Sequence, residues 1–240
     1  LIYFFYTTIC KLSARYEAND RFALRGTVST GFRAPGIQQA MFSQVSTNLN
    51  SAGVLTDTLT ARADSGVTRA LGISPLKEEE SLNFGIGFTA QLSDAFSLTM
   101  DVFQIDIDDR IIFSGEVVPE AAAGCNATNS NCPIRAALAP FNVGQAQFFT
   151  NAIDTKTKGI DIVAEYDTEL GNGDPFVLSA LVHFNDTEVT ARHSTSSILP
   201  ASVLFPDAQV TLVEEGQPGA HHVLGANWTH DAWNFDVRAN

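Results

Sequence analysis

The sequence lacks any run of about 18 apolar residues, the length that a transmembrane helix needs, so no such helix is expected. A transmembrane β-strand escapes this test, because only every second residue of such a strand has to be apolar. The opening residues 1–6 are apolar but short, with no basic residues before them and no initiator Met. They make a poor signal peptide, and we interpret them as part of a strand or as the ragged end of a fragment.

Basic residues are few and scattered along the chain. Its 240 residues include 14 Lys and Arg against 27 Asp and Glu, which gives a net charge of −13. Nucleic-acid binding requires clustered Lys and Arg that neutralise phosphates, so this class of partner is excluded. The sequence also contains no nucleophile elbow, no phosphate-binding loop and no zinc signature. We therefore expect neither an enzyme nor a cofactor.

Strict alternation of apolar and polar residues is the strongest pattern present. Before the turn at Ser93-Asp94, residues 81–92 place Leu, Phe, Ile, Phe, Ala and Leu on one side and polar residues or glycine on the other. After the turn, residues 96–102 alternate in the same sense. A period of two residues indicates β-strands, so this stretch predicts a β-hairpin with one apolar face and one polar face.

The same pattern predicts eight strands, at residues 11–18, 21–31, 78–92, 95–107, 158–168, 176–188, 220–229 and 232–240. Short turns rich in Asn, Asp and Gly alternate with long polar connections at residues 32–77, 108–157 and 189–219. A barrel in an outer membrane has this asymmetry, with short periplasmic turns and long extracellular loops. A soluble β-sandwich would have to place every long loop at one end. We therefore predict an all-β, antiparallel up-and-down transmembrane β-barrel.

An aromatic residue follows two positions after the Asp of each short turn. These residues are Phe22, Phe96, Phe176 and Trp233. Membrane barrels carry aromatic girdles where the apolar band meets water, so four rings in one register predict a girdle just above the turns.

The alternation changes phase in the strand predicted at 95–107. Up to Val102 the even positions are apolar, whereas from Phe103 onward the odd positions are. A β-bulge would explain the change, and so would the exit of the strand from the apolar band.

Several short motifs resemble one known family when they are taken in order. They are Gly-Phe-Arg-Ala-Pro at residues 31–35, Leu-Lys-Glu-Glu-Glu-Ser-Leu-Asn-Phe-Gly at 76–85, Asp-Arg-Ile at 109–111, Asn-Ala at 151–152 and Thr-Lys-Gly-Ile-Asp at 157–161. The set is similar to the C-terminal part of the barrel of TonB-dependent outer-membrane receptors, although Glu78 stands where that family usually has Pro. The resemblance covers roughly residues 20–240.

The resemblance implies a barrel of about 22 strands around an N-terminal plug domain that carries the TonB-contact segment. Eight strands here occupy about 230 residues, so a barrel of that size would need roughly 600. We therefore interpret residues 1–240 as one partial barrel domain, about 8 of about 22 strands, without the plug and the remaining strands.

Two cysteines, Cys125 and Cys132, enclose six polar or small residues within a long connection. On the cell exterior such a pair predicts a disulfide that shapes the loop, with free thiols or a metal pair as alternatives. A metal site at His183, His221 and His222 is not expected, because neighbours on a strand point to opposite faces. The acids Asp106, Asp108 and Asp109 are interpreted as solvated, with cation or ligand contacts as the alternative.

The resemblance implies energised uptake of a scarce nutrient complex, such as a ferric siderophore, cobalamin or a glycan. Its expected partners are outer-membrane lipid, TonB through the plug domain, and a small-molecule ligand at the extracellular loops, in the outer membrane of a Gram-negative bacterium. The ligand-binding residues are not readable from the sequence. Two alternatives stay open: a complete eight-stranded passive barrel, for which eight is a permitted strand number, and a soluble β-sandwich that binds a ligand.

Overall fold

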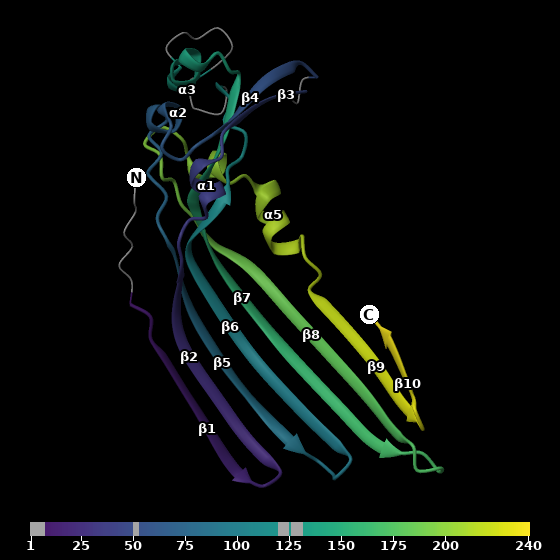
Figure 1. The fold of residues 1–240 in the computed structure, drawn as a ribbon. Helices are drawn as coiled ribbons and strands as arrows, with labels where there is room; N and C mark the ends of the chain where they lie inside the picture. Colours follow the sequence, from purple (N-terminus) through teal and green to yellow (C-terminus); the bar gives the residue numbers. More distant parts are fainter. Residues whose placement is uncertain (1–7, 50–52, 120–124, 126–131) are drawn as a thin grey trace.

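A curved antiparallel sheet of long strands, which we call the wall, dominates the computed structural model (Figure 1). The structure describes residues 8–49, 53–119, 125 and 132–240. The wall follows the order β1-β2-β5-β6-β7-β8-β9-β10, and every neighbouring pair within it is antiparallel. Its strands are β1 Lys11–Asn19, β2 Phe22–Arg33, β5 Glu79–Gln91, β6 Phe96–Phe113, β7 Gln145–Glu169, β8 Pro175–Arg192, β9 Ala220–His230 and β10 Trp233–Ala239.

These eight strands confirm the predicted all-β, up-and-down architecture. Four tight turns close the hairpins at one end of the wall, which we call the turn end, and the long connections leave from the opposite loop end (Figure 1). In the described part of the chain β1 and β10 are edge strands, so the sheet does not close. An open sheet agrees with a partial barrel.

The long connections are folded, whereas the sequence predicted only long polar loops. The first contains a hairpin of β3 Gln44–Leu49 and β4 Leu55–Ala61, and β4 pairs in parallel with the start of β7. The prediction that residues 108–157 form one polar loop is wrong, because β6 continues to Phe113 and β7 already begins at Gln145. The helical elements are α1 Ile37–Met41, α2 Gly66–Ala70, α3 Pro133–Leu138, the 3-10 helix η2 Ala139–Phe141, α4 Ala201–Leu204 and α5 Asp207–Glu215.

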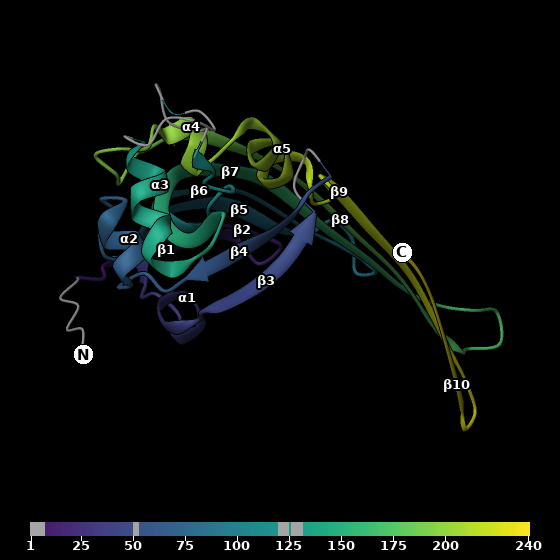
Figure 2. The ribbon, with the colours of Figure 1, turned by 90° about the horizontal axis from the view of Figure 1, so that it is seen from above.

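The described residues of 34–78, 114–148 and 193–219 make up a folded unit at the loop end, which we call the cap. All three connections contribute to its core, through Val67 and Leu71, Val117 and Phe148, and Leu204. Each of these five side chains is fully buried. Seen from above, the wall is an open arc, and β3 and β4 run across its hollow side (Figure 2).

Helix α5 covers the free upper edge of β8. Strand β9 pairs with β8 only as far as Phe184, and above that point the Val189 N–H donates to Glu214 Oε1 of α5 at 2.8 Å. A helix that satisfies an exposed strand edge prevents unwanted pairing there. No helix in the described ranges is long and apolar enough to cross a membrane.

Candidate functional site

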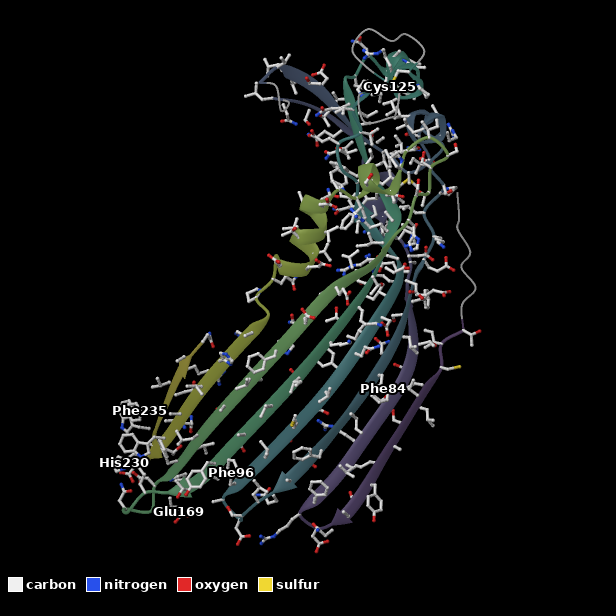
Figure 3. The ribbon with its side chains drawn as sticks, turned by 180° about the vertical axis from the view of Figure 1, so that it is seen from behind. Phe84, Phe96, Cys125, Glu169, His230 and Phe235 are labelled. Atoms are coloured by element: carbon white, nitrogen blue, oxygen red, sulfur yellow. A yellow bond between two sulfur atoms is a disulfide. The ribbon has the colours of Figure 1, made fainter. Side chains whose placement is uncertain are left out.

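The register of the wall assigns each side chain to one of two faces. Residues directly opposite one another on neighbouring strands share a face, and we call such a set a row. One row is apolar across six strands and contains Tyr16, Leu24, Phe88, Met100, Ile162 and Val182. Phe84, halfway along the wall, lies on the same apolar face (Figure 3). Many of the large side chains on this face are exposed.

The four predicted girdle residues all lie on this apolar face, and their rows step regularly. Phe22 shares a row with Leu98, and Phe96 lies two residues nearer the turn end than Leu98. By the same registers, Phe176 lies two residues beyond the row of Phe96, and Trp233 two beyond that of Phe176. The girdle therefore descends two residues for every two strands crossed.

This step measures the tilt of the strands. Two residues advance about 6.8 Å along a strand, and two strand spacings cover about 9.6 Å across the sheet. If the four rings lie at one height, the tangent of the tilt angle is about 0.7, which corresponds to a tilt of roughly 35°. Transmembrane barrels tilt their strands by about 35–45°. A girdle at one level therefore requires a strand tilt that transmembrane barrels have.

The loop-end limit of the apolar band is stepped in the same direction. On β5 Leu82 is still apolar, whereas its partner on β6 is Asp106 and the next residue of that row on β7 is Lys156. The β5–β6 register is unbroken through Val102 and Phe103, so the bulge offered for the phase change is wrong. Strand β6 instead leaves the apolar band there, and the register shift between β6 and β7 lies farther on, between Ile107 and Ile111.

The polar face carries a charged row at mid-height. The row contains Arg15, Arg25, Gly87, Asp101, Asp161, His183 and His221. Arg25 reaches across Gly87 and binds Asp101 through both Nε and Nη2. A Cβ at Gly87 would collide with the Asp101 side chain, so the ion pair requires glycine there. A hollow of about 520 Å³ lies over this part of the polar face.

At the loop end, residues from the first four family-like motifs meet in a hydrogen-bonded cluster. We call it the junction, and it comprises Arg33, Lys77, Glu79, Asp109, Ile111 and Asn151. The Glu79 side chain is buried, yet its carboxylate accepts bonds from Arg33 Nε at 2.6 Å and from the Ile111 N–H at 2.7 Å. The motifs therefore fix the points at which strands β2, β5, β6 and β7 pass into the cap.

Asn151 holds the other half of the junction. Its Nδ2 donates to the carbonyl oxygens of Lys77 at 3.0 Å and Asp109 at 2.6 Å, and its Oδ1 accepts from the Lys77 N–H at 3.0 Å. Asp109 has a φ of 55°, which few non-glycine residues adopt. Its carboxylate lies 2.5 Å from Lys77 Nζ, so Asp109 is paired rather than merely solvated. Asp106 is paired as well, with Lys156 at 3.4 Å.

At the turn end, one carboxylate links two neighbouring hairpins. Asp174 Oδ2 accepts from Asn172 Nδ2 at 2.6 Å and Trp228 Nε1 at 3.1 Å, and it lies 2.7 Å from His230 Nδ1. Burial alone would raise the pKa of Asp174, but the hydrogen bonds from His230, Asn172 and Trp228 outweigh it and hold that pKa below its ordinary value. His230 and Phe235 lie at the same end, close to Glu169 (Figure 3).

The cysteines and histidines fall in different regions. Cys125 and Cys132 are joined by a disulfide in the cap, and the Cys132 side of it belongs to the cap core (Figure 3). Cys10 is free and exposed. His222 lies on the apolar face against Phe184, whereas His183 and His221 are direct partners on the polar face. This pair could not be predicted from the sequence, because only the register between β8 and β9 brings the two residues together.

An open, tilted antiparallel wall with one apolar face, a girdle at its turn end and large folded connections at the other end defines an outer-membrane type of β-barrel. The sequence matches the family described as TonB dependent receptor-like, beta-barrel over residues 8–240. The chain therefore belongs to the TonB-dependent receptor family. A search of curated protein sequences found no match.

Solved structures with a similar fold include two transporters. The copper transporter OprC has a TM-score of 0.50 and 14% identity, over 93% of this chain and 24% of that one. The FrpB iron transporter from Neisseria meningitidis (F3-3 variant) has a TM-score of 0.50 and 12% identity, over 96% of this chain and 25% of that one. The chain thus spans about a quarter of the length of these structures, and such identities show the fold alone.

Proposed function

We propose that residues 1–240 are one partial barrel domain, forming wall and outer loops of a TonB-energised transporter in the outer membrane of a Gram-negative bacterium. The apolar face contacts lipid, the polar face lines the lumen, and the cap lies outside the cell. The regular step of the girdle carries this proposal, because four rings at one level of a tilted wall fit an apolar slab of constant thickness.

The transported ligand is a scarce nutrient complex, such as a ferric siderophore, cobalamin or a glycan, which binds at the cap. Its release into the periplasm requires a plug domain and contact with TonB. We assign no catalytic role to the chain. The family match and the unclosed sheet argue against a complete eight-stranded passive barrel. The exposed apolar face of the wall argues against a soluble sandwich, which would bury that face between two sheets.

Uptake assays on the source bacterium test this proposal. Deletion of the gene should abolish growth on one of the three ligand classes when that ligand is the only source of its nutrient. Deletion of tonB should give the same defect, and extra copies of the receptor gene in the tonB mutant should not repair it. Uptake that continues without TonB would refute energised transport and favour a passive barrel.

A further inference from the structure

We propose that His183 and His221 form a binding site for a divalent transition-metal ion on the polar face of the wall, with Asp161 orienting His183. One ion would bind one nitrogen of each imidazole and would complete its coordination with water. This site does not depend on the proposed uptake function.

The register brings the two imidazoles together. His183 on β8 and His221 on β9 are direct cross-strand partners. Two residues along, the Asn185 N–H donates to the Gly219 carbonyl at 2.9 Å, and antiparallel pairs of one type recur every two residues. His183 and His221 therefore form a hydrogen-bonded antiparallel pair, with Cα atoms about 5.5 Å apart and side chains on one face. That separation allows two imidazoles to reach one ion.

Two hydrogen bonds assign the roles of the two ring nitrogens of His183. Its Nδ1 lies 2.5 Å from Asp161 Oδ1, and its Nε2 lies 2.8 Å from Asn185 Nδ2. Because an amide NH₂ can only donate, Nε2 is the acceptor, and Nδ1–H donates a hydrogen bond to Asp161 Oδ1. A histidine that binds a metal through one nitrogen and donates the other N–H to a carboxylate has this arrangement. The Nε2 lone pair is thus available to an ion that displaces the Asn185 amide.

The surroundings hold the ring and supply charge. Phe103 stacks on His183 with ring centroids 6.1 Å apart and an interplanar angle of 14°. Asp101, the next acid in the row, is already neutralised by Arg25, so Asp161 supplies the negative charge nearest to His183. An imidazole ring restrained by a stacked neighbour loses less freedom when it binds an ion.

The number of ligands determines which ions suit the site. In the described ranges, no three His, Cys, Asp or Glu side chains form a ready cluster for a metal, so this is an open site with two protein ligands. Imidazole ligands suit Cu²⁺, Ni²⁺ and Zn²⁺, and affinity for a given set of nitrogen ligands is greatest for Cu²⁺. Cu²⁺ is therefore the most sensitive probe.

Titration with copper chloride tests the site on the protein purified in detergent without a polyhistidine tag. We expect one equivalent of Cu²⁺ to bind, with electron paramagnetic resonance showing coupling to two imidazole nitrogens. His183→Asn and His221→Asn should each abolish this signal. His222→Asn is the matched control, because the adjacent residue faces away, and it should leave binding unchanged. Asp161→Asn should keep both ligands but weaken binding by about 10–100-fold.

The resonance of the unmodified protein keeps the test independent of how well any variant folds. A spectrum without nitrogen coupling in the unmodified protein would overturn the proposal. Binding that survives loss of His183, or falls equally with His222→Asn, would also overturn it, because the copper would then be held elsewhere.

Discussion

Two alanines on the apolar face test the slant of the lipid-facing band. Ala180 on β8 lies four residues above Phe176, and Ala220 on β9 lies eight residues above Trp228. At a tilt of roughly 35°, each residue rises by about 2.8 Å, so Ala180 lies about 11 Å above the girdle. Trp228 shares the row of Phe176 one strand farther on, which places it one residue above the girdle, so Ala220 lies about 25 Å above the girdle. In a band about 25 Å tall, Ala180 is near the midplane and Ala220 near the outer interface.

Arginine at these two sites should therefore have unequal effects. We expect Ala180→Arg to cost about 2–4 kcal/mol of folding free energy and Ala220→Arg about 0–1 kcal/mol. Alanine is a suitable host, because its replacement removes little packing. The measurement is equilibrium unfolding by denaturant of the protein folded into phospholipid vesicles, with Ser179→Arg on the polar face as the control for lumen-side effects.

The result that would refute this reasoning is equal destabilisation at the two alanines. Ala220 is the direct partner of Phe184, whose row continues through Ile160 and Val102 to Ile86. If height followed the rows, Ala220 would lie deep in the band and Arg there would be as costly as at Ala180. A large penalty at Ser179 would instead refute the assignment of faces.

Three further predictions concern the ends of the wall. Glu79→Gln should lower the free energy of unfolding by about 1–3 kcal/mol, because the buried charge-assisted hydrogen bond to Arg33 is lost. Thermal denaturation measures this loss. The control is Glu80→Gln at an exposed position, which should leave the stability almost unchanged. Because the pKa of Asp174 is depressed on folding, its contacts stabilise the turn above about pH 3.9 and are lost as the pH falls through the lower folded value. Trp228 emission, recorded in a protein that also carries Trp233→Phe, should therefore change only in acid. The Asp174→Asn variant has no carboxylate to protonate at this position, so it should not show this acid step. An identical acid step in the Asp174→Asn variant would contradict the assignment. Reduction of the cap disulfide should destabilise the cap by about 2–3 kcal/mol, which hydrogen exchange would show as faster exchange in the cap. Equally faster exchange in the wall strands would contradict a stabilising effect confined to the cap.

The wall could be predicted from the sequence because its signals are local. Alternation over ten or more residues and tight turns at Asn, Asp and Gly specify each hairpin without reference to distant residues. The girdle was also predictable, since Phe22, Phe96, Phe176 and Trp233 keep one spacing from their turns. Their stepped rows were not, because tilt is a property of the register between strands.

The cap and the polar row could not be predicted in this way. Helices α1 and α2 have five residues each and β3 has six, too short to show a clear period. Their stability comes from a core shared by three connections. Likewise, the side chains of His221 and His222 point to opposite faces of β9. The partner of His221 is His183, which lies 38 residues earlier in the sequence on β8.

The shared core of the cap constrains the order in which the molecule assembles. Ser196 Oγ donates to the Leu71 carbonyl, and Gln145 Nε2 donates to Thr58 Oγ1, across 125 and 87 residues of sequence. Contacts of such long range form slowly, because distant segments must first be brought together. Each hairpin can form from residues that are close in sequence, but the cap core cannot be completed until the residues that follow β8 are in place.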